Sequence, residues 1–251
     1  MLNWFQANAT RSSSGIGKIK ADFIEMLQRA REEFLLACQP AIHGVPSDTV
    51  CEEVTRLDKM VNKAERQIRK ELVIHCSVRG QVSPEALVFM SIAKDAERLG
   101  DYAKNIFDMS ELAPCAPLGA EKEQLVLLKL LIFRIFDLCI LSIQEENEGS
   151  ARQAICECRW IGKQCDGVTK TLLNLETPGC RTASDVLMFR FMKRIASHLR
   201  NICSSVVQPV HKLDFTKKIS KSVEISGTIL DRKAEFLEEF NAEIRKYEKT
   251  I

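Results

Sequence analysis

The sequence predicts an all-α protein with two tandem three-helix-bundle repeats and a further C-terminal helix. The 251 residues include only 11 Gly and 7 Pro, and 45% are apolar while 6% are aromatic, a composition that favours helices over a sheet sandwich. From about residue 17 onward, apolar residues recur every three or four positions, which is the helical period. The order of helices and breaks in the first half returns in the second half, which indicates an internal repeat.

The charge and the cysteine content argue against a nucleic-acid-binding protein, a secreted protein and a zinc protein. The net charge of +2 gives no overall attraction to nucleic acid or to membranes. Residues 1–16 lack the continuous apolar core of a secretory signal and are predicted to be a flexible lead. The ten cysteines are scattered without a C-x-x-C spacing, which favours reduced, mostly buried thiols over a zinc site. We therefore expect a cytoplasmic protein.

The most apolar segment, residues 125–143, is long enough to cross a bilayer. However, Lys129, Arg134 and Asp137 interrupt it, and each charge at a helix centre would cost roughly 2.5–3.5 kcal/mol on insertion. The segment is therefore predicted to be a buried bundle helix and not a transmembrane span. Its apolar surface could also support a homodimer.

The first repeat is expected to cover residues 17–115. Its first helix carries the apolar series Phe23, Leu27, Ala30, Phe34, Ala37 and Ala41. A break at Pro46 and Ser47 precedes a second helix with Val54, Leu57, Val61, Ala64, Ile68 and Leu72. A third helix restarts at Pro84, a residue suited to a first helical turn, and continues through Ile106. A proline-rich linker follows at residues 114–117.

The second repeat is expected over residues 116–213, with helices at about 119–146, 155–175 and 183–211. Three apolar positions of the second helix, Leu57, Val61 and Ile68, match Ile161, Cys165 and Leu172 at an offset of 104 residues. Residues 103–106 match residues 199–202 at an offset of 96, sharing an Asn-Ile pair. The difference between the two offsets predicts a shorter connection before the last helix of the second repeat, since repeats usually diverge in their loops.

The C-terminal segment, residues 214–251, is predicted to contain one amphipathic helix at about 226–250. Phe236, Phe240, Ile244 and Tyr247 form one apolar stripe among alternating charges. Such a stripe packs against the bundle or binds a partner.

Acidic side chains line one face of the third helix. Glu97 and Asp101 are four residues apart, so they stack on one face with Asn105 below them. The second helix offers a comparable stripe in Asp58, Asn62 and Glu65. If the two helices are antiparallel, the stripes could converge on one hard cation.

Two further observations bear on this face. The carboxylates could instead form ion pairs with Lys94, Arg98 or Lys104. Gly100 lies between the two acids, and a mid-helix glycine costs about 1 kcal/mol relative to alanine. That cost favours a close approach by another helix or by a ligand.

The segment from Asp95 to Ile106 resembles the signature of the PhoU family. Family members contain two three-helix repeats, each with an acidic E-x-x-x-D motif in an E-R-I-G-D context. The stretch from Leu57 to Asn62 is similar to the companion helix of the same repeat.

The resemblance implies a site for a divalent or iron-type metal ion. Its ligands would be Asp58, Asn62, Glu97 and Asp101. It also implies a non-enzymatic regulator of phosphate uptake and signalling. Such a regulator contacts a phosphate-specific transporter ATPase, a sensor histidine kinase, or both.

The second repeat departs from the family motif. At the offset of 96, Lys193 takes the place of Glu97, and Ser197 the place of Asp101. Residues 84–111 contain three basic and six acidic residues, a net charge of −3, whereas residues 182–212 contain five basic residues and one acidic, a net charge of +4. A lysine at a ligand position opposes a divalent cation, so we expect one metal-binding face at most.

Other functions are less well supported by the sequence. A di-iron carboxylate enzyme requires E-x-x-H pairs, and none is present, because Glu71 and His75 are four residues apart. The chain has no G-x-x-x-x-G-K loop for a nucleotide. The four histidines, His43, His75, His198 and His211, form no cluster in the sequence and are assigned no chemistry. A helical scaffold with a vestigial acidic motif stays open as an alternative.

Overall fold

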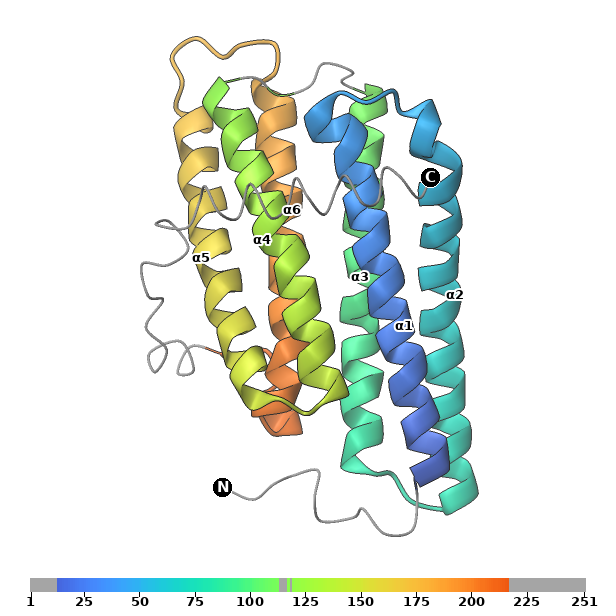
Figure 1. Ribbon diagram of the computed structural model, residues 1–251. Helices are drawn as coiled ribbons and strands as arrows, with labels where there is room; N and C mark the ends of the chain where they lie inside the picture. The colour runs from blue at the N-terminus through green and yellow to red at the C-terminus, as the bar shows by residue number, and fades with distance from the viewer. Residues whose placement is uncertain (1–12, 113–116, 118, 217–251) are drawn as a thin grey trace.

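The computed structural model describes residues 13–112, 117 and 119–216, and these residues form six long helices without a strand (Figure 1). The all-α prediction is therefore confirmed. The six helices are α1 (Ser13–Cys38), α2 (Asp48–Arg79), α3 (Pro84–Leu112), α4 (Gly119–Gln144), α5 (Glu148–Leu173) and α6 (Thr182–Val207). Two short helices, η2 (Gln39–His43) and η3 (Val210–Lys212), follow α1 and α6.

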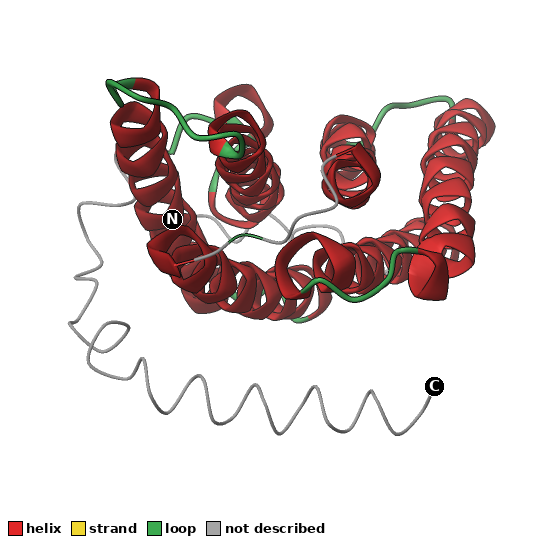
Figure 2. Cartoon of the chain, turned by 90° about the horizontal axis from the view of Figure 1, so that it is seen from above, coloured by secondary structure: helices red, strands yellow, loops and turns green. Residues whose placement is uncertain are grey.

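The six helices pack as two groups of three. Helices α1, α2 and α3 contact one another, as do α4, α5 and α6. The groups are joined where α3 lies against α6 and α1 lies against α4. From above, the two groups stand side by side along this junction (Figure 2).

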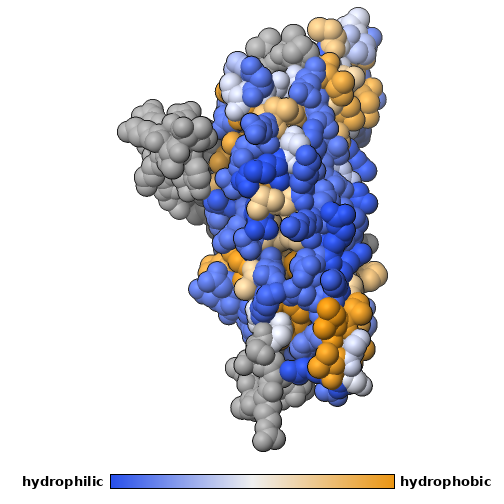
Figure 3. Space-filling view, turned by 90° about the vertical axis from the view of Figure 1, so that its right-hand side faces the viewer, coloured by the Kyte–Doolittle hydropathy of each residue, from blue (hydrophilic) through white to orange (hydrophobic). Residues whose placement is uncertain are grey.

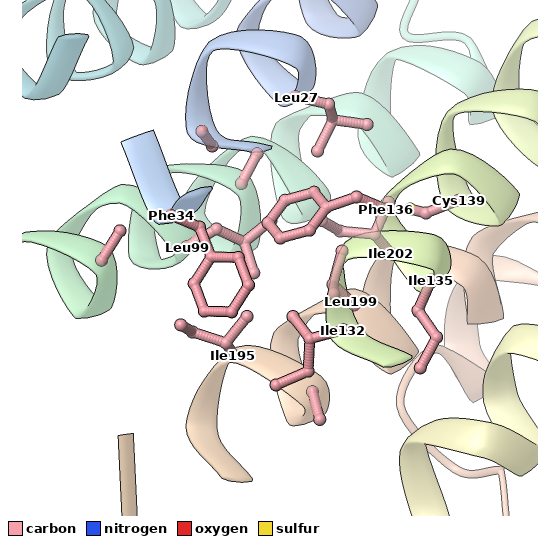
Figure 4. Close-up of a cluster of buried hydrophobic side chains, with 14 of the residues drawn as sticks. Leu27, Phe34, Leu99, Ile132, Ile135, Phe136, Cys139, Ile195, Leu199 and Ile202 are labelled. Atoms are coloured by element: carbon pink, nitrogen blue, oxygen red, sulfur yellow. The ribbon is translucent and has the colours of Figure 1, made fainter. Parts of the chain in front are cut away.

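One hydrophobic core runs through both groups. Phe34 of α1 and Phe136 of α4 meet at its centre with their ring centroids 5.9 Å apart. Around them lie aliphatic side chains from α3, α4 and α6, among them Leu99, Ile132, Ile195 and Leu199 (Figure 4). Because apolar burial is the main stabilising term in folding, we expect the two groups to depend on each other for stability.

The helix boundaries differ from the predicted ones at both ends of the first helix and in the second repeat, where α5 begins at Glu148 and α6 ends at Val207. Helix α1 begins at Ser13 and not at residue 17, so the predicted lead of residues 1–16 is too long. The end of α1 is a π-helical turn, η2, which sequence periodicity did not indicate. Gly44 then closes the turn with a left-handed φ of 72°, a conformation that glycine adopts without strain.

The predicted shortening of the connection between α5 and α6 is wrong. This connection covers residues 174–181, whereas the one between α2 and α3 covers only residues 80–83. The second repeat is shorter because α5 has 26 residues and α2 has 32. Leu72 is the last buried residue of α2, so the final turns of this helix are more exposed than the rest of it.

Helix α4 is a buried bundle helix, as predicted. Its apolar side chains are mostly buried within the chain, which leaves little of the helix for the homodimer surface that its sequence suggested.

Lys129 is fully buried, and its Nζ lies 3.0 Å from Nε2 of His43. Burial lowers the pKa of Lys129. None of the described helices is both long enough and apolar enough to span a bilayer.

Two of the predictions concern residues outside the described part of the chain. The boundary between the repeats, at residues 115 and 116, and the C-terminal helix at 226–250 lie outside the described residues.

The nine cysteines within the described residues are free thiols and most of them are buried, as expected for reduced cysteines.

A polar network joins α3 to α6 at the junction of the two groups. Oδ1 of Asp95 lies 2.7 Å from Nδ1 of His198 and accepts a hydrogen bond of 3.1 Å from Nδ2 of Asn201. His198 stacks on Tyr102, whose hydroxyl accepts a hydrogen bond from Nε of Arg194. The sequence assigned no role to His198. The structure makes it a buried contact between the groups.

We predict that Asp95→Ala destabilises the whole six-helix structure. Removing this acceptor leaves His198 and Asn201 without their shared partner in a buried position, at a cost of roughly 1–3 kcal/mol. Urea unfolding followed by circular dichroism measures the change. Asp108→Ala is the matched control, because Asp108 pairs with Lys104 at the surface, where a pair contributes about 0–1 kcal/mol. Equal losses in the two variants would contradict the prediction.

Candidate functional site

The four predicted site residues lie where α2 and α3 run side by side. Asp58 and Asn62 come from α2, and Glu97 and Asp101 from α3. They line two open hollows. Asn62 and Glu97 face one, with Lys59, Glu65 and Arg66 around them. Asp58 and Asp101 face the other, together with Arg98, Tyr102, Lys104 and Asn105.

The side chains on this face are paired with one another. Nδ2 of Asn62 donates to Oδ1 of Asp58 at 3.2 Å. Lys94 Nζ lies 2.7 Å from Oε1 of Glu97, and Arg98 Nη1 lies 2.8 Å from Oδ2 of Asp101. The ion pairs that the sequence left open as an alternative are therefore present. Within the described part of the chain, no three His, Cys, Asp or Glu side chains are grouped closely enough to hold a metal ion.

The pairing leaves the carboxyl groups of the acidic face partly desolvated. Partial burial raises the pKa of Asp101, and the neighbouring Glu97 raises it further while Arg98 opposes the shift. Partial burial also raises the pKa of Asp58, although Lys104 opposes it. Oε2 of Glu97 is buried without a hydrogen-bond donor and lies 3.9 Å from Nε of Arg98, while Oε1 of the same carboxylate is paired with Lys94. The carboxylates are thus matched in charge by basic neighbours, but one oxygen of Glu97 has no hydrogen-bond donor.

A fifth acid, Glu33 of α1, lies directly beneath this face and was missed in the sequence. Its side chain is fully buried, and neither carboxyl oxygen has a hydrogen-bond partner. The signal for it was present, because Glu33 lies on the apolar stripe of its helix between Ala30 and Ala37. An acid on such a stripe is expected to be buried.

Gly100 is what allows Glu33 to fit. A Cβ atom at Gly100 would lie 3.0 Å from Oε2 of Glu33 and 3.1 Å from Cγ1 of Val61. Both neighbours are buried and have little room to move. The close approach expected from this mid-helix glycine is therefore confirmed, and the approaching groups come from α1 and α2.

Glu33 is a neutral acid at physiological pH. Burial raises its pKa to about 10, and repulsion from Asp58 and Asp101 adds to the shift, while Lys104 opposes it. Glu33 therefore carries a proton in a position where its charge would be costly.

The second repeat closes the corresponding face with an ion pair. Nζ of Lys193 contacts Oδ1 of Asp166. These residues take the places of Glu97 and Asn62 at the two repeat offsets. A lysine ammonium thus lies where the first repeat has a carboxylate, and it is bound to the neighbouring helix.

We predict that Glu33 makes stability depend on pH. The pKa of Glu33 rises from 4.5 to about 10 on folding. The contribution of Glu33 to stability is therefore greatest below pH 4.5 and is lost as the pH rises from 4.5 toward 10. Between about pH 5 and about pH 8 the loss should be on the order of 3 kcal/mol, and Glu33→Gln should remove it.

Urea unfolding of both proteins across this pH range measures the effect. Glu32→Gln is the control, because Glu32 is the exposed neighbour of Glu33 and its removal leaves the buried acid in place. A wild-type pH profile that Glu33→Gln leaves unchanged would show that Glu33 is not responsible.

Residues 24–109, which include Glu33 and all four predicted site residues, match the model of the PhoU domain. No curated protein matches the sequence.

Two crystal structures share the fold. PhoU from Pseudomonas aeruginosa aligns with a TM-score of 0.69 and 16% identity over 78% of this chain and 97% of its own. The phosphate transport system regulatory protein PhoU from Streptococcus pneumoniae aligns with a TM-score of 0.69 and 17% identity over 78% and 95%. The resemblance seen in the sequence is confirmed: residues 24–109 match the model of the PhoU domain, and the six helices have the fold of the PhoU proteins.

Proposed function

We propose that this protein is a non-enzymatic regulator of phosphate uptake. It would act in the cytoplasm by binding a phosphate-specific transporter ATPase, a sensor histidine kinase, or both. The observation that carries the proposal is the PhoU domain of residues 24–109, which contains the whole acidic face. The shared fold of the Streptococcus pneumoniae protein, a phosphate transport system regulatory protein, supports it.

We propose further that the acidic face binds a divalent or iron-type cation through Asp58, Asn62, Glu97 and Asp101. Carboxylate and amide oxygens are the ligands that hard cations prefer. Two observations support this: Oε2 of Glu97 is buried without a hydrogen-bond donor, and burial together with the neighbouring Glu97 raises the pKa of Asp101. To bind a cation, Glu97 and Asp101 would leave Lys94 and Arg98, and the two hollows would draw together.

Co-purification from the native cell tests the regulatory proposal. The tagged full chain is expected to recover a phosphate transporter ATPase or a sensor kinase, in amounts that differ between phosphate-rich and phosphate-starved cells. Recovery of neither under both conditions would overturn the proposal. Recovery of unrelated proteins alone would favour the scaffold alternative.

Metal content tests the cation proposal separately. After anaerobic purification, the wild type is expected to carry more metal than the double variant Glu97→Ala with Asp101→Ala, as measured by elemental analysis. Glu52→Ala with Glu123→Ala is the matched control, since it removes two exposed carboxylates away from the hollows. Equal metal in all three proteins would exclude this site and leave the regulatory proposal intact.

A further inference from the structure

An apolar surface lies at the end of the first repeat where α2 turns into α3. Five of the eleven exposed large hydrophobic side chains in the described residues lie in this short stretch. They are Val73, Ile74, Val78, Val82 and Leu87, with exposed fractions from 48% to 82%. Single exposed aliphatic residues are common, but a cluster of this size indicates a binding surface. We call these five residues the apolar tip.

The apolar tip spans the turn between the two helices: Val73, Ile74 and Val78 lie on the last turns of α2, Val82 lies in the loop, and Leu87 lies on the first turn of α3. Figure 3 shows apolar surface gathered at the lower end of the α2 face, below a hydrophilic middle. Ile74 and Val78 are four residues apart and share one helix face. Val78 is 82% exposed, so the described residues leave most of it uncovered.

Helix α1 begins beside this surface. A Cβ atom on Gly15 would lie 2.6 Å from Nδ1 of His75, the residue that follows Ile74. One turn further along α1, Nζ of Lys18 lies 2.6 Å from Oε1 of Glu71. The chain that precedes Ser13 therefore joins the bundle next to the apolar tip.

The twelve residues before α1 have the composition that such a surface requires. They include Leu2, Trp4 and Phe5, and their only charged side chain is Arg11. Trp4 is one of two tryptophans in the protein. Aromatic side chains contribute most of the energy of apolar contacts because each buries a large area.

We propose that residues 1–12 dock on the apolar tip of the same chain, with Trp4 and Phe5 covering Ile74 and Val78. The seven residues between Phe5 and α1 span up to ~23 Å when extended, and the α2 portion of the tip is only ~10 Å long. The reach is sufficient. A tether of this length holds the segment at an effective concentration in the millimolar range, so modest affinity suffices for docking.

The fluorescence of Trp4 tests this proposal directly. In a Trp160→Phe background, Trp4 is the only tryptophan in the full chain. Its emission is expected at short wavelength, with quenching by acrylamide several-fold weaker than in urea. Adding Ile74→Asp and Val78→Asp should shift the emission to long wavelength and restore full quenching.

Leu173→Asp is the matched control, because it places one charge at an exposed aliphatic position at the end of α5. It should leave Trp4 protected. Circular dichroism verifies that each variant is folded, as expected for substitutions at exposed positions.

Four results would overturn the proposal. Equal quenching of Trp4 in the folded and the unfolded protein would show that the segment is not docked. Protection of Trp4 that survives Ile74→Asp with Val78→Asp would place the segment elsewhere. Protection that is lost on dilution would assign the tip to a second copy of the chain. Finally, Trp4 could be protected only when phosphatidylglycerol vesicles are added, with the two tip substitutions abolishing vesicle binding. That result would make the tip a lipid-binding surface.

Discussion

The close approach of α1 and α2 to Gly100 of α3 is the constraint around which the first repeat is arranged. Because Gly100 has no side chain, Oε2 of Glu33 and Cγ1 of Val61 occupy the space that a Cβ atom would need. The three helices meet there, with a buried acid at the point of contact and two partly buried acids, Asp58 and Asp101, facing it. The packing of the core and the electrostatics of the surface are therefore linked at one position.

This link has a consequence for the acidic face. Asp58 and Asp101 both raise the pKa of Glu33, so any cation that neutralised them would make ionisation of Glu33 less costly. In the absence of a cation, the proton on Glu33 limits the total negative charge between the helices. Proton occupancy at Glu33 and cation occupancy at the proposed site would then oppose each other, as reciprocal linkage between two sites requires.

The sequence predicted the features that depend on neighbouring residues and missed those that depend on distant ones. Helical period, breaks at prolines and the spacing of Glu97 and Asp101 are local, and the six helices and the acidic face follow from them. The apolar stripe of α1 indicates that Glu33 is buried, but its place beneath the acidic face depends on Val61 and Gly100, residues far along the chain. The contact of Asp95 with His198 joins residues 103 positions apart, so no local pattern indicates it.

The two repeats resolve the same electrostatic problem in different ways. In both, two helices bring polar side chains together at corresponding positions on a partly buried face. The first repeat keeps Asn62 and Glu97 there and leaves an oxygen of Glu97 without a donor. The second repeat has Asp166 and Lys193, which pair directly. A lysine is a cation held in place by its own chain, so this face is neutralised without a ligand. Helix packing that is common to both repeats thus supports two different polar faces: in the first, basic residues of the same helix pair with Glu97 and Asp101, and in the second, a lysine pairs with the neighbouring helix.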